Sequence, residues 1–263
     1  MSERSESGLA YEVAGSGPAV LLFHEGIGDR STWDPHWHSL SERFTAIRFD
    51  ARGFGESADP TGPYTLHGDG TEILNVVGIE RAALVGCSMG GGAALDLTLA
   101  APHRVTALAT AGSTPSGWEH TRDIHAQWEE VDAVFERDGA AAANELELRM
   151  WVDGVGRTEP ADGRIRARIG ALNAALLERQ QHFEVGPSEL DPPAIERLGE
   201  VAVPVLAMFG SHDQPSVIAG TRALAQGTGA ELVEIAEAAH LPSLERPGEF
   251  EAVLMPFLSA NVV

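Results

Sequence analysis

Short apolar runs recur along the chain, separated by longer stretches in which apolar residues return with helical spacing. The runs predict strands over residues 9–13, 19–24, 45–50, 82–86, 105–109, 203–209 and 231–235. The last five runs are apolar almost throughout, which is typical of parallel strands that are covered on both faces. The first run precedes a Gly-Ser-Gly-Pro turn, and we expect it to form an antiparallel edge strand.

The stretches between the runs predict helices over residues 66–77, 89–100, 217–225 and 249–258. Strands that alternate with helices in this way favour an α/β fold. We therefore expect a doubly wound, mostly parallel sheet with helices on both faces.

Residues 116–195 interrupt this alternation. They carry helical patterns over residues 120–137, 140–151 and 164–183 but no strand pattern, and prolines close the segment before the next strand. We interpret residues 1–115 and 196–263 as the core and residues 116–195 as an inserted helical cap, or lid. Because sites of open α/β sheets form beyond the carboxyl ends of the strands, this cap is expected to cover the site.

Three tryptophans of the cap, Trp118, Trp128 and Trp151, are candidate substrate contacts. The alternative is that they form the cap's own apolar core. Arginines at 149, 164, 166 and 168 are a possible source of positive charge for a substrate carboxylate, although helical arginines are usually solvated.

Composition narrows the class of partner. The chain has 263 residues, of which 43% are hydrophobic and 22% charged, and 39 acidic against 18 basic residues give a net charge of −21. A surface this acidic repels phosphate backbones and anionic lipid headgroups, so nucleic acid and membranes are not expected partners. A small-molecule substrate is expected, and the oligomeric state stays open.

The only cysteine is Cys87, so no internal disulfide is expected, which fits a reducing compartment. No secretory signal and no membrane-length apolar run is present, and a cytoplasmic location is the prediction. The ten histidines lack metal-ligand spacing, and the glycines at 53 and 55 do not form a dinucleotide fingerprint. Neither a metal nor another cofactor is expected.

The segment Gly86-Cys87-Ser88-Met89-Gly90 matches the pattern G-x-S-x-G between a predicted strand and a predicted helix. A nucleophile on such a sharp turn has strained backbone dihedrals, and glycines two residues to either side avoid a clash. The amino terminus of the helix also offers free N–H groups to an oxyanion. The context therefore predicts Ser88 as a nucleophile, and Cys87 as a small apolar group packed beneath the turn.

A serine nucleophile needs a base, and the base needs an acid to orient it. Asp213 follows the strand over residues 203–209, and His240 follows the last strand. The order serine, aspartate, histidine is that of α/β-hydrolase triads. We predict a triad of Ser88, Asp213 and His240. His212 is the rival base, but it adjoins the acid and would have to turn away from it.

Together these segments resemble the α/β-hydrolase superfamily over residues 9–116 and 203–258. His24-Glu25-Gly26 stands where the family has His-Gly-x, and residues 50–57 (DARGFGES) are similar to its D-x-R-G-x-G-x-S stretch. Residues 240–247 (HLPSLERP) resemble the segment that carries the family's histidine. The resemblance implies an oxyanion hole made by the backbone N–H groups of Gly26 and Met89.

One residue departs from the family pattern. Glu25 replaces the glycine that commonly follows the histidine, and it adjoins the predicted oxyanion hole. An anion aimed at an oxyanion would cancel the stabilisation, so we expect the Glu25 side chain to point to solvent.

The resulting hypothesis is a hydrolase that acts through an acyl-enzyme, on an ester or lactone of a small carboxylic acid. A serine nucleophile disfavours the dehalogenase and epoxide-hydrolase chemistries of the superfamily, which use aspartate. A C–C bond hydrolase, a perhydrolase-like activity on the same triad, and a ligand-binding protein without turnover stay open as alternatives.

Overall fold

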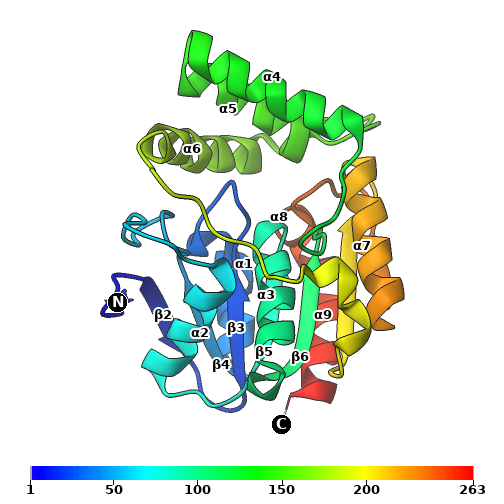
Figure 1. The fold of residues 1–263 in the computed structure, drawn as a ribbon. Coiled ribbons are helices and arrows are strands. Elements are labelled where there is room, and N and C mark those ends of the chain that lie inside the picture. The colour runs from blue at the N-terminus through cyan, green and yellow to red at the C-terminus, as the bar shows by residue number, and fades with distance from the viewer. Residues whose placement is uncertain (1, 263) are drawn as a thin grey trace.

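The computed structural model describes residues 2–262, which form an α/β sheet with a helical cap (Figure 1). Eight strands are arranged in the order β1-β2-β4-β3-β5-β6-β7-β8. The six strands from β4 to β8 in this order run parallel, while β1 and β2 are antiparallel additions at one edge. The strands are β1 (Glu3–Arg4), β2 (Ala10–Ala14), β3 (Ala19–Phe23), β4 (Thr45–Phe49), β5 (Ala82–Cys87), β6 (Val105–Ala111), β7 (Val205–Gly210) and β8 (Glu231–Ile235).

Helices cover both faces of the sheet, because alternate residues of each buried strand face opposite sides. Leu21 and Leu84 pack toward the face of α2, α3 and α7, and Val20 and Val85 pack toward the face of α1 and α9. These helices are α1 (Asp34–Ser41), α2 (Leu66–Val77), α3 (Met89–Ala100), α7 (Pro215–Thr228) and α9 (Pro247–Asn261). Short helical turns complete the core: η1 (Arg30–Trp33), η2 (Pro102–Arg104), η4 (Ala194–Glu196), η5 (Leu198–Glu200) and α8 (Pro242–Glu245).

The chain between β6 and β7 holds a separate helical layer. Figure 1 shows α4, α5 and α6 lying above one end of the sheet. A turn of π-helix, η3, follows directly on α5. The elements of this layer are α4 (Arg122–Asp138), α5 (Ala140–Leu148), η3 (Arg149–Asp153) and α6 (Gly163–Gln180).

The predicted fold class is confirmed, and the strands begin and end within two residues of the predicted bounds. Two details of the prediction are wrong. Strand β2 was predicted to be the edge strand, but β1 lies outside it and forms the edge. Because β1 has only two residues, it gives no recognisable pattern in the sequence. The run over residues 231–235 is not covered on both faces: β8 is the last strand of the sheet, and its glutamates are exposed.

Helix α1 was not predicted from the sequence. Its eight residues include only one aliphatic side chain, Leu40, and its other buried residue is His36. His36 is held by Glu251 and by the Ser243 carbonyl, contacts that join segments distant in the sequence.

None of the helices within residues 2–262 combines the length and the apolar character that crossing a membrane requires.

Candidate active site

Ser88 occupies a strained turn between β5 and α3. Its backbone has φ 50° and ψ −122°, a conformation that L-residues rarely adopt. A Cβ atom on Gly86 would overlap the Gly90 carbonyl, and one on Gly90 would overlap the His24 carbonyl. The glycines of the G-x-S-x-G segment are therefore required for the close approach of β5, α3 and the loop after β3, as predicted.

The three residues of the predicted triad lie together beyond the ends of β5, β7 and β8. His240 Nε2 is 2.7 Å from Ser88 Oγ, and His240 Nδ1 is 2.9 Å and 3.0 Å from the two Asp213 carboxylate oxygens. Asp213 is buried, and its Oδ1 accepts a further hydrogen bond from the Gln214 N–H at 2.7 Å. The hydrogen bonds from His240 and from the Gln214 N–H together fix the orientation of the Asp213 carboxylate.

The rival residues lie apart from this relay. The His212 ring is turned away from the site, with Nδ1 3.1 Å from the Val155 carbonyl oxygen and Nε2 3.5 Å from Glu237. Cys87 is buried beneath the turn, where burial raises the pKa of its thiol. A thiol held in its protonated form is a poor nucleophile.

Gly26 and Met89 face each other beside Ser88, because a Cβ atom on Gly26 would lie 3.5 Å from Met89 Sδ. Within residues 2–262 neither backbone N–H has an acceptor. His24 shapes the loop that carries Gly26: its Nε2 accepts a hydrogen bond from the Ala51 N–H, so its Nδ1 donates to the Glu25 carbonyl. A free N–H on the residue after a serine nucleophile, with a second on a residue that contacts it, is suited to bind an oxyanion.

The prediction that Glu25 points to solvent is wrong. The side chain is 2% exposed and folds under its own loop, where Oε2 is 3.1 Å from Thr32 Oγ1. The Thr32 hydroxyl is also 2.8 Å from the Asp29 carbonyl and has only one proton to give. Glu25 Oε1 has no partner among the described residues. Burial raises the pKa of Glu25, which shifts its equilibrium toward the neutral acid.

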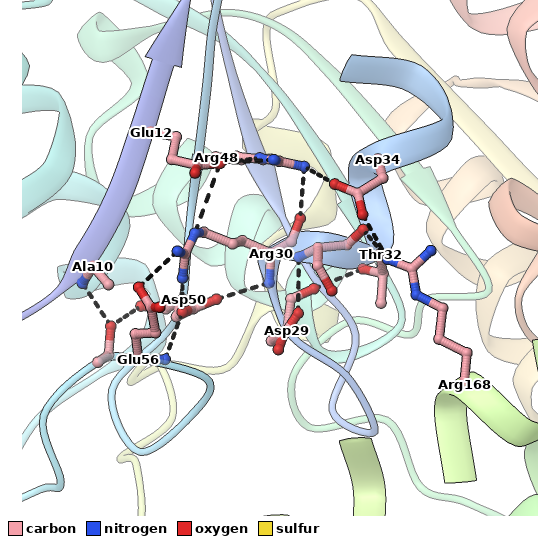
Figure 2. Close-up of polar contacts among 12 residues, drawn as sticks. Ala10, Glu12, Asp29, Arg30, Thr32, Asp34, Arg48, Asp50, Glu56 and Arg168 are labelled. Carbon is pink, nitrogen blue, oxygen red and sulfur yellow. Dashed lines mark hydrogen bonds and ion pairs between the residues drawn. The ribbon is translucent and has the colours of Figure 1, made fainter. Parts of the chain in front are cut away.

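A buried ionic network ties this loop to the segment after β4 (Figure 2). Asp50 is fully buried and accepts hydrogen bonds from the N–H groups of Arg30 and Glu56 and from the Arg30 guanidinium. The Asp50 carbonyl accepts from Ser57 Oγ, which itself accepts from the Ala10 N–H. The segment over residues 50–57 therefore braces the loop of Gly26 rather than contacting Ser88.

The same network reaches the cap. Arg168 of α6 donates to the Ser31 carbonyl at 2.6 Å and to Asp34 at 2.8 Å, and Arg48 binds the other oxygen of Asp34 (Figure 2). The loop of Gly26 is thus held from both the sheet and the cap.

The cap segment around η3 contacts the loops that carry the acid and the base. Gln214 Nε2 donates to the Met150 carbonyl at 2.8 Å. Arg157 forms a 2.6 Å ion pair with Glu245, whose other oxygen accepts from the Ala239 N–H. Sequence reasoning missed these bracing residues, because a single arginine in an irregular segment has no pattern. The only available signal was the position of Glu245 in the segment that carries the histidine.

The three cap tryptophans take different places. The Trp151 ring lies against the His240 imidazole, with 4.5 Å between ring centroids. Trp118 and Trp128 line a cavity of about 450 Å³, which we name the α3 cavity. Met89 and Asp96 also line it. All three rings are half-buried.

A second cavity of about 450 Å³, here named the Gly26 cavity, contains Gly26, Phe54, Tyr64 and Phe183. The two cavities share Leu66, Met89 and Pro187, so they adjoin at the residue that follows Ser88. Both lie between the core and the segments of the cap. This arrangement gives a substrate two directions in which to extend from the serine.

Metal-ligating side chains are not gathered in this region. Within residues 2–262, no set of three or more His, Cys, Asp or Glu side chains has the arrangement of a metal site.

Comparisons with known proteins identify the family. Residues 18–247 match the family described as alpha/beta hydrolase fold. The chain is 26% identical to 3-oxoadipate enol-lactonase 1 of Acinetobacter baylyi, over 99% of this chain and 96% of that protein. It superimposes with a TM-score of 0.78 on the enol-lactonase of Burkholderia xenovorans LB400, at 23% identity, over 98% of this chain and 100% of that one.

A longer relative is the dihydrolipoyllysine-residue acetyltransferase component of the acetoin cleaving system of Cupriavidus necator, at 27% identity over 95% of this chain. The chain spans 66% of that protein and 30% of the mycobacterial proteins that it also matches. With the family matched over most of its length, this chain belongs to the alpha/beta hydrolase superfamily.

Proposed function

We propose that this hydrolase cleaves an ester or a lactone of a small carboxylic acid with Ser88 as the nucleophile. The observation that carries the proposal is the continuous relay from Ser88 Oγ through His240 to Asp213, with distances of 2.7 Å and 2.9 Å. A ligand-binding protein without turnover has no physical need for this relay. The enol-lactonase relative supports lactones as one class of substrate.

In the proposed mechanism, His240 Nε2 accepts the proton of Ser88 Oγ as the oxygen attacks the carbonyl carbon. Asp213 accepts a hydrogen bond from Nδ1–H and stabilises the imidazolium. The N–H groups of Gly26 and Met89 donate to the oxyanion. The imidazolium then protonates the leaving oxygen, and the acyl group stays on Ser88. A water that gives its proton to His240 attacks the acyl-enzyme, releases the acid and restores the serine.

We propose further that the helical layer over residues 116–195 acts as a lid that selects the substrate. The position of Trp128 in the α3 cavity supports this role. Trp128→Ala is expected to change the relative rates on short and long acyl chains by about tenfold, because a void replaces an indole wall. The matched control is Trp37→Ala on α1, which should lower stability and leave the ranking alone. An unchanged ranking of short and long acyl substrates in Trp128→Ala would contradict the proposal that the helical layer acts as a lid.

The nucleophile is tested with Ser88→Ala and a fluorophosphonate. The variant should lose activity by several orders of magnitude, because the members of a triad act as a unit, and its melting temperature should stay near that of the wild type. Mass spectrometry of the inhibited wild type should find one adduct, on the peptide that contains Ser88. An adduct on another residue would overturn the proposal.

The base is tested with a pair of histidine variants. His240→Ala should cost about as much activity as Ser88→Ala. His212→Ala is the control and should stay active, because its ring faces Val155 and Glu237. The opposite result would mean that the base is wrongly assigned.

A further inference from the structure

The α3 cavity begins at Met89, the residue that follows Ser88, and runs along one face of α3. Met89, Gly92, Ala93 and Asp96 all line it, and their spacing is that of one helical face. At 1.5 Å per residue, Asp96 lies about 10 Å along the helix from Met89. A substrate group that extends from the serine into this cavity therefore has Asp96 at its far end.

Asp96 is buried and forms no close ion pair among the described residues, although the charge of Arg197 acts on it from a greater distance. Asp96 is 7% exposed, and its Oδ1 accepts a hydrogen bond from Ser116 Oγ at 2.7 Å. Within residues 2–262 no arginine or histidine forms an ion pair with it, and the nearby Arg197 pairs with Glu200 instead. Burial, followed by the charge of Glu189, raises the pKa of Asp96 to about 6. At neutral pH this carboxylate is mostly ionised and has no cation in direct contact among the described residues.

The wall opposite α3 is aromatic. The imidazoles of His120 and His125 stand edge-on to the Trp128 ring, with 5.1 Å and 5.4 Å between centroids. Burial lowers the pKa of His120, and also that of His67 in the same cavity, so both rings are neutral at pH 7. An aromatic wall with neutral imidazoles facing a carboxylate is a suitable environment for an organic cation.

The two adjoining cavities contain carboxylates and no cationic partner for an anion. Asp96 and Glu189 line the α3 cavity and Glu184 lines the Gly26 cavity, and none of the described arginines lines either one. The sequence contains no lysine, so arginine is the only permanent cation available. The cap arginines considered for a substrate carboxylate bind other carboxylates: Arg164 pairs with Asp162, Arg166 with Asp153 and Arg168 with Asp34.

We propose that the hydrolase prefers esters or lactones that carry an alkylammonium group, held in the α3 cavity between Asp96 and Trp128, and discriminates against anionic ones. This inference rests on the proposed function of Ser88. The net charge of −21 acts in the same direction, because it raises the local concentration of cations around the molecule.

The test is a set of p-nitrophenyl esters of matched shape. The acyl groups are γ-trimethylammoniobutyrate, its tert-butyl isostere and γ-sulfobutyrate. A second set carries the charge on the alcohol: butyrylcholine, its tert-butyl isostere and sulfoethyl butyrate. In one of the two sets, kcat/KM for the cation should exceed that for the sulfonate by about tenfold or more, with the neutral ester between them.

Asp96→Asn should reduce the ratio of cationic to neutral kcat/KM about fivefold, while damage to the fold would lower both rates together. The control, Asp138→Asn, removes one charge from the exposed end of α4 and should leave the ratio unchanged. If Asp96→Asn does not fold, two other measurements decide whether the inference holds: the ranking of the esters by the wild type, and the ratio of cationic to neutral kcat/KM for Trp128→Leu. Hydrolysis of the neutral esters without preference for the cation overturns this inference alone. Hydrolysis of none, with no adduct on Ser88, overturns the proposed function and the inference together.

Discussion

At the scale of single residues, the chemistry of this site depends on side chains that are buried at a cost. Glu25 and Asp96 are both carboxyl groups whose pKa is raised by burial, and each lies near the serine or the cavity that leads from it. A fold keeps such groups when they serve the site, because apolar replacements would be more stable. Glu25 shapes the loop of Gly26, and Asp96 closes the α3 cavity.

Glu25→Gln should show what burial of the Glu25 carboxyl costs. Because its pKa is raised in the folded state, the folded protein binds more protons than the unfolded chain above the unfolded pKa. The carboxyl's contribution to the free energy of unfolding therefore falls as the pH rises through this window. The stability of Glu25→Gln relative to the wild type should therefore increase as the pH rises above the ordinary pKa of a glutamic acid.

Urea unfolding at a series of pH values measures this difference. Glu56→Gln is the matched control, since Arg30 beside it lowers the pKa of this exposed carboxyl. The free energy of unfolding of Glu56→Gln, relative to that of the wild type, should not increase with pH. A pH-independent difference for Glu25→Gln would show that Glu25 titrates alike in both states.

The sequence was sufficient to predict that Ser88, Asp213 and His240 lie together, but not the place of Glu25. Ser88, Asp213 and His240 each follow a strand, so local pattern and chain order brought them to one edge of the sheet. The direction of the Glu25 side chain depends on Thr32 and on the absence of a side chain at Gly28. No local pattern encodes such a contact between parts of one loop.

At the scale of elements, the cap is joined to the core by a few specific polar contacts. The segment of η3 contacts the loops of Asp213 and His240, and α6 contacts the loop of Gly26 through Arg168. The helices of the cap were predictable from their periodicity, whereas these contacts were not. The π-helical turn of η3 follows α5 without a break, so the periodic pattern over residues 140–151 continued through it.

Arg168→Ala should loosen the attachment of α6 to the loop of Gly26. Its ion pair with Asp34 is partly exposed, so the free energy of unfolding should fall by only about 1 kcal/mol or less. The larger effect is local: amides of α6 and of residues 24–34 should exchange hydrogen faster, and KM should rise more than kcat falls.

Hydrogen exchange followed by mass spectrometry measures this effect. The control is Arg164→Ala on the same helix, since Arg164 is almost fully exposed and Asp162 is its only polar partner within residues 2–262. Equal amide hydrogen exchange in Arg168→Ala and Arg164→Ala would show that Arg168 does not attach α6 to the loop of Gly26.

At the scale of the whole molecule, an excess of negative charge surrounds a site that forms where three parts of the chain meet. Ser88 is separated from Asp213 by more than a hundred residues of core and cap, and His240 lies 27 residues beyond Asp213, yet the parallel sheet brings their loops to one edge. The charge was plain from composition. Its distribution was not, because only the fold shows that the arginines bind carboxylates on the surface and at the cap attachment.

Salt should stabilise this protein. Arginines such as Arg48 and Arg166 are already in close ion pairs, while 39 acidic residues against 18 basic ones leave many carboxylates to repel each other at long range. Screening weakens interactions beyond a Debye length much more than contacts of a few ångströms. Raising sodium chloride from about 10 mM to about 200 mM should therefore increase the melting temperature by about 2–4 °C, as about 1 kcal/mol of repulsion is removed. Calorimetry at constant pH measures the shift, and an equal osmolarity of a neutral sugar separates screening from general exclusion effects. A melting temperature that falls with salt would mean that the ion pairs, and not the repulsion, dominate the electrostatics of the fold.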